Sequence, residues 1–122
     1  SAMGLCRRAV VAEYLAKELQ QSPSDEMADI LIQSLGDVGN AYAWKTAPAK
    51  RFSHEEKRVR GVAAKALYEQ YLLADEGVLR DRSLKGLVVV NHGETRSWMD
   101  ASRLDGGPHV LEALDRLQSR LR

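Results

Sequence analysis

Few residues in this sequence have the side chains that most often carry out chemistry, and they lie far apart. The three histidines, His54, His92 and His109, show no spacing typical of metal ligands. The single cysteine, Cys6, offers no thiolate pair for zinc, cannot close an internal disulfide and belongs to no motif that would orient it against a histidine for nucleophilic catalysis. The sequence therefore predicts no metal site, no cofactor and no enzymatic activity.

A different chemistry, contact with polyanions, is suggested by a segment rich in basic residues. Within residues 45–60 the candidates for contacting phosphates are Lys45, Lys50, Arg51, Lys57 and Arg58. Glu55 and Glu56 partly neutralise this segment, and the whole chain has a net charge of only +1. A helical DNA-binding or regulatory domain that uses this segment is therefore the alternative function.

Large aromatic side chains outside the periodic stretches are candidates for binding a partner. Trp44 and Phe52 lie in the aperiodic stretch 40–52, and Trp98 lies near the start of a short predicted helix. Aromatic residues bury much surface with few rotatable bonds, which suits the centre of an interface. The sequence predicts that these three residues anchor a peptide or another protein, and burial in the chain's own core is the alternative.

The elements that position these residues are expected to form one domain. The chain has 122 residues, of which 44% are hydrophobic and 29% charged, and its mean hydropathy is −0.37. No apolar run approaches the ~20 residues of a transmembrane helix, and no secretory signal pattern is found. We expect a soluble, cytoplasmic protein in which residues 1–4 resemble a cloning remnant and residues 5–122 form a single helical domain.

Hydrophobic periodicity predicts an all-α fold of about five helices in antiparallel pairs. The expected helical stretches are 5–21, 23–39, 53–75, 79–87, 97–104 and 108–121, of which 97–104 is short. Pro23 and Asp25 are expected in the first turn of the second of these. Residues 87–90, with the sequence Leu-Val-Val-Val, fit either the continuation of a helix, which we favour, or a short buried strand.

Several residues are expected to mark helix boundaries. Ser53 precedes Glu56 by three positions, which is the spacing of a capping box. Gly36 and Gly39 are expected to end the second helix, because glycine suits the residue that follows a helix. By the same argument Gly77 is expected to end the third.

The last predicted helix has one narrow apolar face. Pro108 is expected to be its first residue, because a missing N–H costs little there. Apolar residues recur at steps of four, three and four residues, namely Val110, Leu114, Leu117 and Leu121. We expect this stripe to dock on the domain's own core. The alternative is a seam for a partner helix, which would allow a homodimer through the C-terminal helix.

Residues 24–90 resemble HEAT-type α-helical repeats. The resemblance is carried by Leu-Gly-Asp-Val-Gly-Asn at 35–40, then Val59-Arg60 with spaced small and apolar residues behind it. It implies that four residues are buried between helices, namely Val59, Ala63, Ala66 and Leu67. It also implies that Asp37 and Arg60 make polar contacts linking repeats. An irregular helical bundle is the alternative fold.

A second motif, Val-Val-Asn-His-Gly-Glu at 89–94, is similar to the signature of histidine phosphatases and phosphoglycerate mutases. That resemblance would make His92 a phosphoryl acceptor. Asn91, however, stands in place of the arginine that binds the phosphoryl group, and phosphoryl transfer needs several fixed positive groups at once. We therefore expect a turn at this position. The favoured function is a non-catalytic protein-interaction module, a scaffold or adaptor built from stacked helices.

Overall fold

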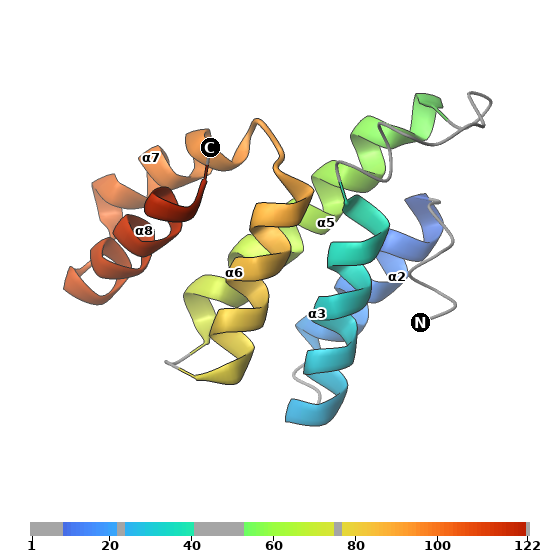
Figure 1. Cartoon of the computed structure of the whole chain (residues 1–122), viewed down its shortest axis with the longest axis horizontal. Coiled ribbons are helices and arrows are strands. Elements are labelled where there is room, and N and C mark those ends of the chain that lie inside the picture. Colours follow the sequence, from blue (N-terminus) through green and yellow to red (C-terminus); the bar gives the residue numbers. More distant parts are fainter. Residues whose placement is uncertain (1–8, 22–23, 41–52, 75–76, 122) are drawn as a thin grey trace.

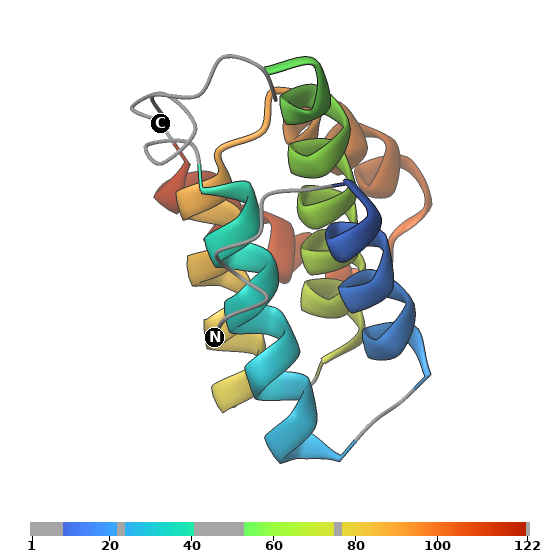
Figure 2. The ribbon, with the colours of Figure 1, turned by 90° about the vertical axis from the view of Figure 1, so that its right-hand side faces the viewer.

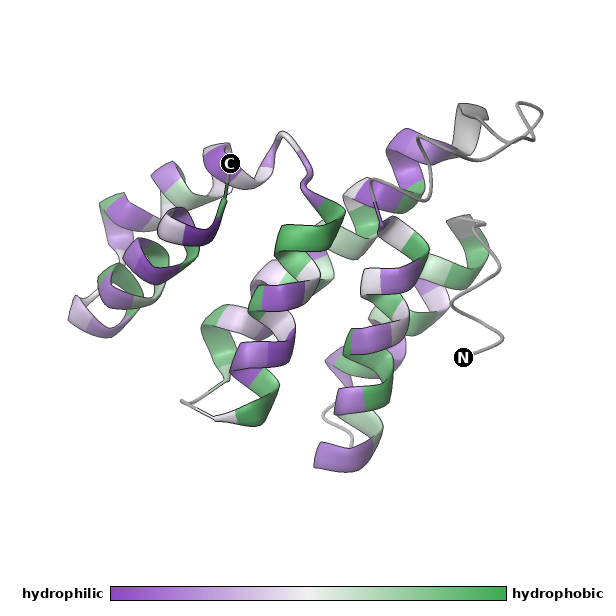
Figure 3. Ribbon diagram, viewed as in Figure 1, coloured by the Kyte–Doolittle hydropathy of each residue, from purple (hydrophilic) through white to green (hydrophobic). Residues whose placement is uncertain are grey.

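The described part of the chain is all-helical, as the sequence predicts, but it contains six helices rather than about five. A computed structural model describes residues 9–21, 24–40, 53–74 and 77–121, without the side chains of 9 and 53–55. In these ranges the helices are α2 (Ala9–Gln20), α3 (Asp25–Gly39), α5 (Ser53–Leu73), α6 (Val78–Val90), α7 (Thr95–Asp105) and α8 (Pro108–Arg120). Residues 88–90 form the last turn of α6, so the strand alternative is wrong. This last turn is hydrophobic and is coloured green in Figure 3.

The helices follow one another as antiparallel hairpins, α2–α3, α5–α6 and α7–α8 (Figure 1). The first two hairpins pack side by side, with α2 against α5 and α3 against both α5 and α6. Figure 2 shows this pairing along the hairpins, with α2 beside α5 and α3 beside α6. The first helices of these hairpins therefore form one layer and the second helices form another.

Small residues allow the central helices to approach closely. A Cβ atom on Gly36 would lie 3.5 Å from the Cα atom of Gly86, so α3 and α6 meet almost backbone to backbone. A Cβ atom on Gly39 would lie only 2.9 Å from the Cβ atom of Ala63 on α5. Gly36 therefore does not end α3 as predicted but lies inside it, at the point where α3 approaches Gly86 of α6. Gly39 is the last residue of α3, as expected.

The apolar core lies along these helix contacts. The burial predicted for Val59, Ala63, Ala66 and Leu67 is confirmed, since each is at most 6% exposed. Each of the six helices contributes to the most deeply buried residues, which include Leu15, Ile32, Leu35, Tyr71, Leu87, Met99, Leu114 and Leu117.

Two of the predicted boundaries can be compared directly with the structure. Helix α3 begins at Asp25, and the Ser24 side chain accepts a hydrogen bond from the Met27 N–H at 3.3 Å, as an N-cap does. Gly77 was expected to end α5, but α5 ends at Leu73 and Gly77 is the N-cap of α6. Its φ of 147° lies in a region open to glycine but costly for other residues, which explains why glycine occurs there. The side chain of Ser53 lies outside the described residues, so the capping box stays a prediction.

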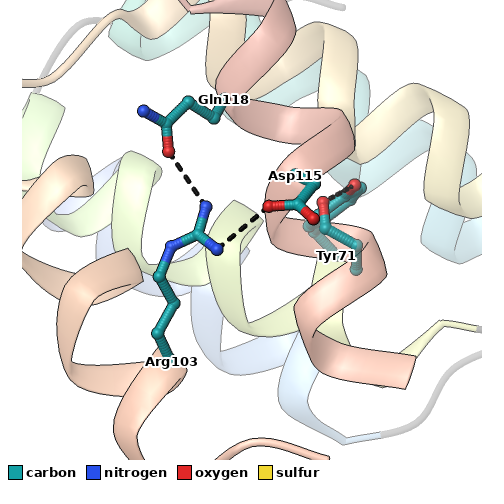
Figure 4. Close-up of polar contacts among 5 residues, drawn as sticks. Tyr71, Arg103, Asp115 and Gln118 are labelled. Carbon is teal, nitrogen blue, oxygen red and sulfur yellow. Dashed lines mark hydrogen bonds and ion pairs between the residues drawn. The ribbon is translucent and has the colours of Figure 1, made fainter. Parts of the chain in front are cut away.

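The α7–α8 hairpin is joined to the rest by two tyrosines of α5. The Tyr71 hydroxyl donates to the Ala113 carbonyl of α8 at 2.5 Å, and the Tyr68 hydroxyl lies 2.7 Å from Ser102 Oγ on α7. Within the hairpin, Arg103 bonds the side chains of Asp115 at 3.0 Å and Gln118 at 2.9 Å (Figure 4).

The apolar stripe of α8 docks on the chain's own core, as expected. Leu114 and Leu117 are fully buried, and Val110 and Leu121 pack against the core while partly exposed. Helix α8 begins at Pro108, as predicted. A homodimer through this helix would have to use a different face, because the predicted seam is already covered within one chain.

The two glycines of α3 give a matched test of the close helix packing. Gly36→Ala places a Cβ atom at ordinary contact distances of 3.5–3.7 Å and removes a helix-interior glycine, so we expect unchanged stability or a gain of up to about 1 kcal/mol. Gly39→Ala meets Ala63 Cβ at 2.9 Å and a Val90 methyl at 3.0 Å, and we expect a loss of about 1–3 kcal/mol from overpacking. Urea unfolding followed by circular dichroism measures both. Equal effects of the two substitutions would contradict the packing described here.

Candidate functional site

A shallow, open groove with several basic residues lies between α5 and the segment from His92 to Trp98 at the start of α7. Its volume is about 520 Å³. The α5 wall consists of Lys57, Arg58, Gly61, Val62 and Lys65, and the opposite wall consists of His92, Glu94 and Trp98. We call this hollow the α5–α7 groove.

The α5 wall is one face of the helix. Lys57, Gly61 and Lys65 are four residues apart, so they lie one above another along the helix surface. The opposite side of α5, at Val59, Ala63 and Leu67, is buried in the core. Because core packing fixes how α5 is rotated, it also fixes which face of α5 borders the groove.

The opposite wall is held in place by aromatic contacts. The His92 and Trp98 rings are stacked, with centroids 5.9 Å apart and an interplanar angle of 8°. Tyr68 of α5 lies against Trp98 at 5.8 Å, and its hydroxyl is 3.1 Å from the Trp98 carbonyl oxygen. Burial raises the pKa of the Tyr68 hydroxyl, which keeps it a neutral donor near neutral pH. Trp98 is therefore partly a core residue and partly a groove residue.

Arg60 fixes the position of the His92 wall relative to α5. Its guanidinium donates to the Val90 carbonyl at 2.8 Å and to the Asn91 carbonyl at 3.2 Å, at the C-terminal end of α6. A cation at this end of a helix also interacts favourably with the helix dipole. This contact joins α5 to the turn that carries His92, within the α5–α6 hairpin. The predicted role of Arg60 in linking repeats stays a prediction. Asp37, the other residue for which such a contact was predicted, is exposed on α3.

His92 presents a hydrogen-bond donor to the groove. Its Nδ1 accepts the Glu94 N–H at 3.2 Å, which places the proton of the neutral ring on Nε2. Nε2 lies beside Gly61, where a Cβ atom would be only 3.7 Å away. Burial lowers the pKa of His92 below its usual 6.5, Arg60 and Lys57 lower it further, and Glu94 opposes this shift. The ring is therefore neutral at physiological pH.

The groove is lined by more cations than carboxylates, and one of these cations already has a carboxylate partner. Three cations face one carboxylate, that of Glu94. Arg58 already forms an ion pair and hydrogen bond with Glu13 of α2. Lys57 and Lys65 are exposed and flank the groove along α5. Among the described residues that line it, none carries a hydroxyl or thiol, so His92 has no nucleophile beside it to activate.

The structure brings together residues that the sequence assigned to two different functions. Trp98, predicted as a partner anchor, and Lys57 and Arg58, predicted as phosphate contacts, line the same groove. The other predicted site residues, Trp44, Phe52, Lys45, Lys50 and Arg51, lie outside the described residues. Sequence reasoning missed Lys65, although its spacing of eight residues from Lys57 signals a shared helix face. It also missed the placement of His92, which depends on a long-range contact.

Two other features do not form a site. A hollow of about 620 Å³ lies at the N-terminal end of α3, where Asp25, Glu26 and Asp29 meet Gln70 of α5. These carboxylates have a local explanation, since Asp25 and Glu26 occupy the first turn of α3 and Asp29 pairs with Arg82 at 3.4 Å. Arg80 is a second unusual cation, but it is only 2% exposed and lies 5.3 Å above the Tyr71 ring.

Within the described ranges, no group of three or more histidine, cysteine and carboxylate side chains is placed to hold a metal ion. No helix in these ranges is both long and apolar enough to span a membrane. Comparison of this chain with protein-family models, with curated proteins and with solved structures gave no match.

The role of Arg60 can be tested against its neighbour on α5. Arg60→Met removes two hydrogen bonds to the end of α6, and we expect the free energy of unfolding to fall by about 1–3 kcal/mol. Arg58→Met removes an exposed ion pair with Glu13, and we expect a change below about 1 kcal/mol. Urea denaturation measures both. A larger effect of Arg58→Met than of Arg60→Met would contradict the capping role.

The lowered pKa of His92 predicts a pH dependence of stability. In the unfolded chain His92 has a pKa near 6.5, so its imidazole binds a proton more readily there than in the folded protein. The stabilisation from His92 is therefore complete above that pH. It is lost as the pH falls from there towards the folded-state pKa. We expect the Tm of the wild type to fall more between about pH 7 and about pH 5 than the Tm of His92→Gln. His109→Gln, on the exposed first turn of α8, is the control and should keep the wild-type slope.

Proposed function

We propose that this chain is a non-catalytic protein-interaction module of stacked, HEAT-like helical hairpins, and that the α5–α7 groove holds a segment of its partner. The observation that carries the proposal is the convergence of Trp98, Lys57 and Lys65 on one hollow beside the buried face of α5. A partly exposed tryptophan with cations around it has the composition of an interface centre and its rim.

The hairpin arrangement supports the scaffold part of the proposal. Helices α2 and α5 pack together, and so do α3 and α6, which is how successive units of a helical repeat bury a continuous core. Such stacks present grooved outer surfaces whose shape depends on rigid helix packing rather than on loops. The groove residues of α5 are positioned in this way.

The contents of the groove also favour binding over catalysis. Of its ionisable groups, Arg58 is paired with Glu13, and His92 is a neutral ring stacked on Trp98. Neither arrangement activates a reacting group, but both give a rigid surface of fixed polarity. A surface that changes little on binding avoids the entropy cost of ordering side chains.

The nucleic-acid alternative is less well supported by the described residues. Arg58, one of its predicted phosphate contacts, already has a carboxylate partner. The formal net charge of +1 provides no long-range attraction for a polyanion. Lys57 remains available to either kind of ligand.

Charge reversal in the groove tests the proposal. The chain is immobilised and proteins captured from an extract are quantified by mass spectrometry for the wild type and for Lys57→Glu combined with Lys65→Glu. We expect capture of the specific partner to fall at least about tenfold, because rim charges steer association and buried contacts resist dissociation. The matched control combines Lys17→Glu with Lys85→Glu, which gives the same net charge from exposed positions on α2 and α6.

The two variants separate a groove effect from a general charge effect. Equal loss of capture in both would show that net charge alone is responsible. Capture that disappears after nuclease treatment would favour the DNA-binding alternative. Either result would overturn the proposed function.

A further inference from the structure

The α5–α7 groove has a charge pattern that specifies more than a general interaction site. Lys57 and Lys65 are eight residues apart on one face of α5, so their Cα atoms are separated by about 12 Å along the helix axis. An extended peptide advances about 3.3 Å per residue, so a chain lying along α5 would cover that distance in about four residues. Carboxylates at this spacing would reach both ammonium groups at once.

The middle of the groove has a different chemistry from its two ends. Between the lysines, α5 contributes the uncharged Gly61 and Val62, together with Arg58, which is already paired with Glu13. The other wall contributes Trp98 and the carboxylate of Glu94. Gly61 has no side chain, and this leaves the His92 Nε2 donor uncovered on that side. The centre therefore offers apolar surface together with one neutral N–H, which matches an apolar side chain beside a peptide carbonyl.

From these features we propose that the α5–α7 groove binds a short extended acidic peptide segment, with two carboxylates about four residues apart on either side of an apolar side chain. The carboxylates pair with Lys57 and Lys65, the apolar side chain lies against Val62 and the Trp98 ring, and His92 Nε2 donates to a backbone carbonyl of the peptide. This inference rests on the proposed function, because it specifies the partner of the same groove.

The aromatic geometry favours a peptide over a single-stranded nucleic acid. Proteins that bind single strands stack successive bases on open aromatic faces along a positively charged groove. Here the Trp98 ring is already stacked with His92 and in contact with Tyr68. The indole therefore offers contact surface to a side chain but is a poor platform for a base.

Fluorescence polarisation with defined probes tests this inference on the full chain. The probe is a labelled peptide of roughly eight residues with blocked ends, two glutamates four positions apart, a leucine between them and serines elsewhere. One control peptide has glutamines in place of the glutamates, and a second has the two glutamates adjacent. An oligothymidylate of similar length represents nucleic acid.

We expect the spaced glutamate peptide to bind at least about tenfold more tightly than either control peptide, and more tightly than the oligothymidylate. Lys57→Glu with Lys65→Glu should reduce this affinity at least about tenfold, whereas Lys17→Glu with Lys85→Glu should change it less than about threefold. Nuclear magnetic resonance of the His92 ring gives an independent readout. Its imidazole resonances should shift when the peptide binds, because Nε2 then donates to a peptide carbonyl.

The other outcomes overturn the inference and are distinguishable from failure of the proposed function. Equal affinity for the spaced and adjacent glutamate peptides would exclude recognition by spacing. Tighter binding of the oligothymidylate would exclude a peptide as the preferred class. If the spaced peptide does not bind but the groove variant still loses its captured partner, the acidic-peptide inference is wrong while the proposed function stands. If neither experiment responds to the groove lysines, both are wrong.

Discussion

The close approach of α3, α5 and α6 is the constraint on which the rest of the described structure depends. Gly36 meets Gly86, Gly39 meets Ala63, and the absent side chain of Gly86 makes room for Leu67, whose methyl group would be 3.0 Å from a Cβ atom there. Helices in contact through side chains of ordinary size pack 8–10 Å apart, and small residues allow the lower end of such a range. Small residues at these contacts thus set how closely the three helices approach one another.

The groove follows from this packing through two further contacts. Because Val59 and Ala63 are buried, α5 must turn Lys57, Gly61 and Lys65 outward. Because Arg60 holds the end of α6, the following turn places His92 against this outward face. The groove therefore depends on both contacts together. Core packing sets which face of α5 borders it, and Arg60 sets where the wall that carries His92 lies.

Much of the fold could be predicted from the sequence because periodicity and capping are local signals. The helix over 87–90 was favoured correctly from the pattern that precedes it, and Pro108 marked the start of α8. Gly36 and Gly77 were assigned wrongly for one physical reason: a glycine ends a helix, permits close packing or adopts a positive φ, and the sequence alone does not distinguish these. The groove was predicted only in parts, because the contact between Gly61 and His92 joins residues distant in the chain.

Helices α5 and α6 contain the same spacing of arginine, small residues and leucine. Residues 60, 63, 66 and 67 are Arg, Ala, Ala and Leu, and residues 80, 83, 86 and 87 are Arg, Ser, Gly and Leu. The small residues and leucines at matching positions are buried in both helices. The arginines differ, since Arg60 caps α6 at the groove while Arg80 is buried over Tyr71. Spacing thus determines which residues face the core, whereas the role of a charged residue depends on what its neighbours in space provide. Of these two arginines only Arg60 positions a wall of the α5–α7 groove, because it bonds the end of α6 from which that wall continues.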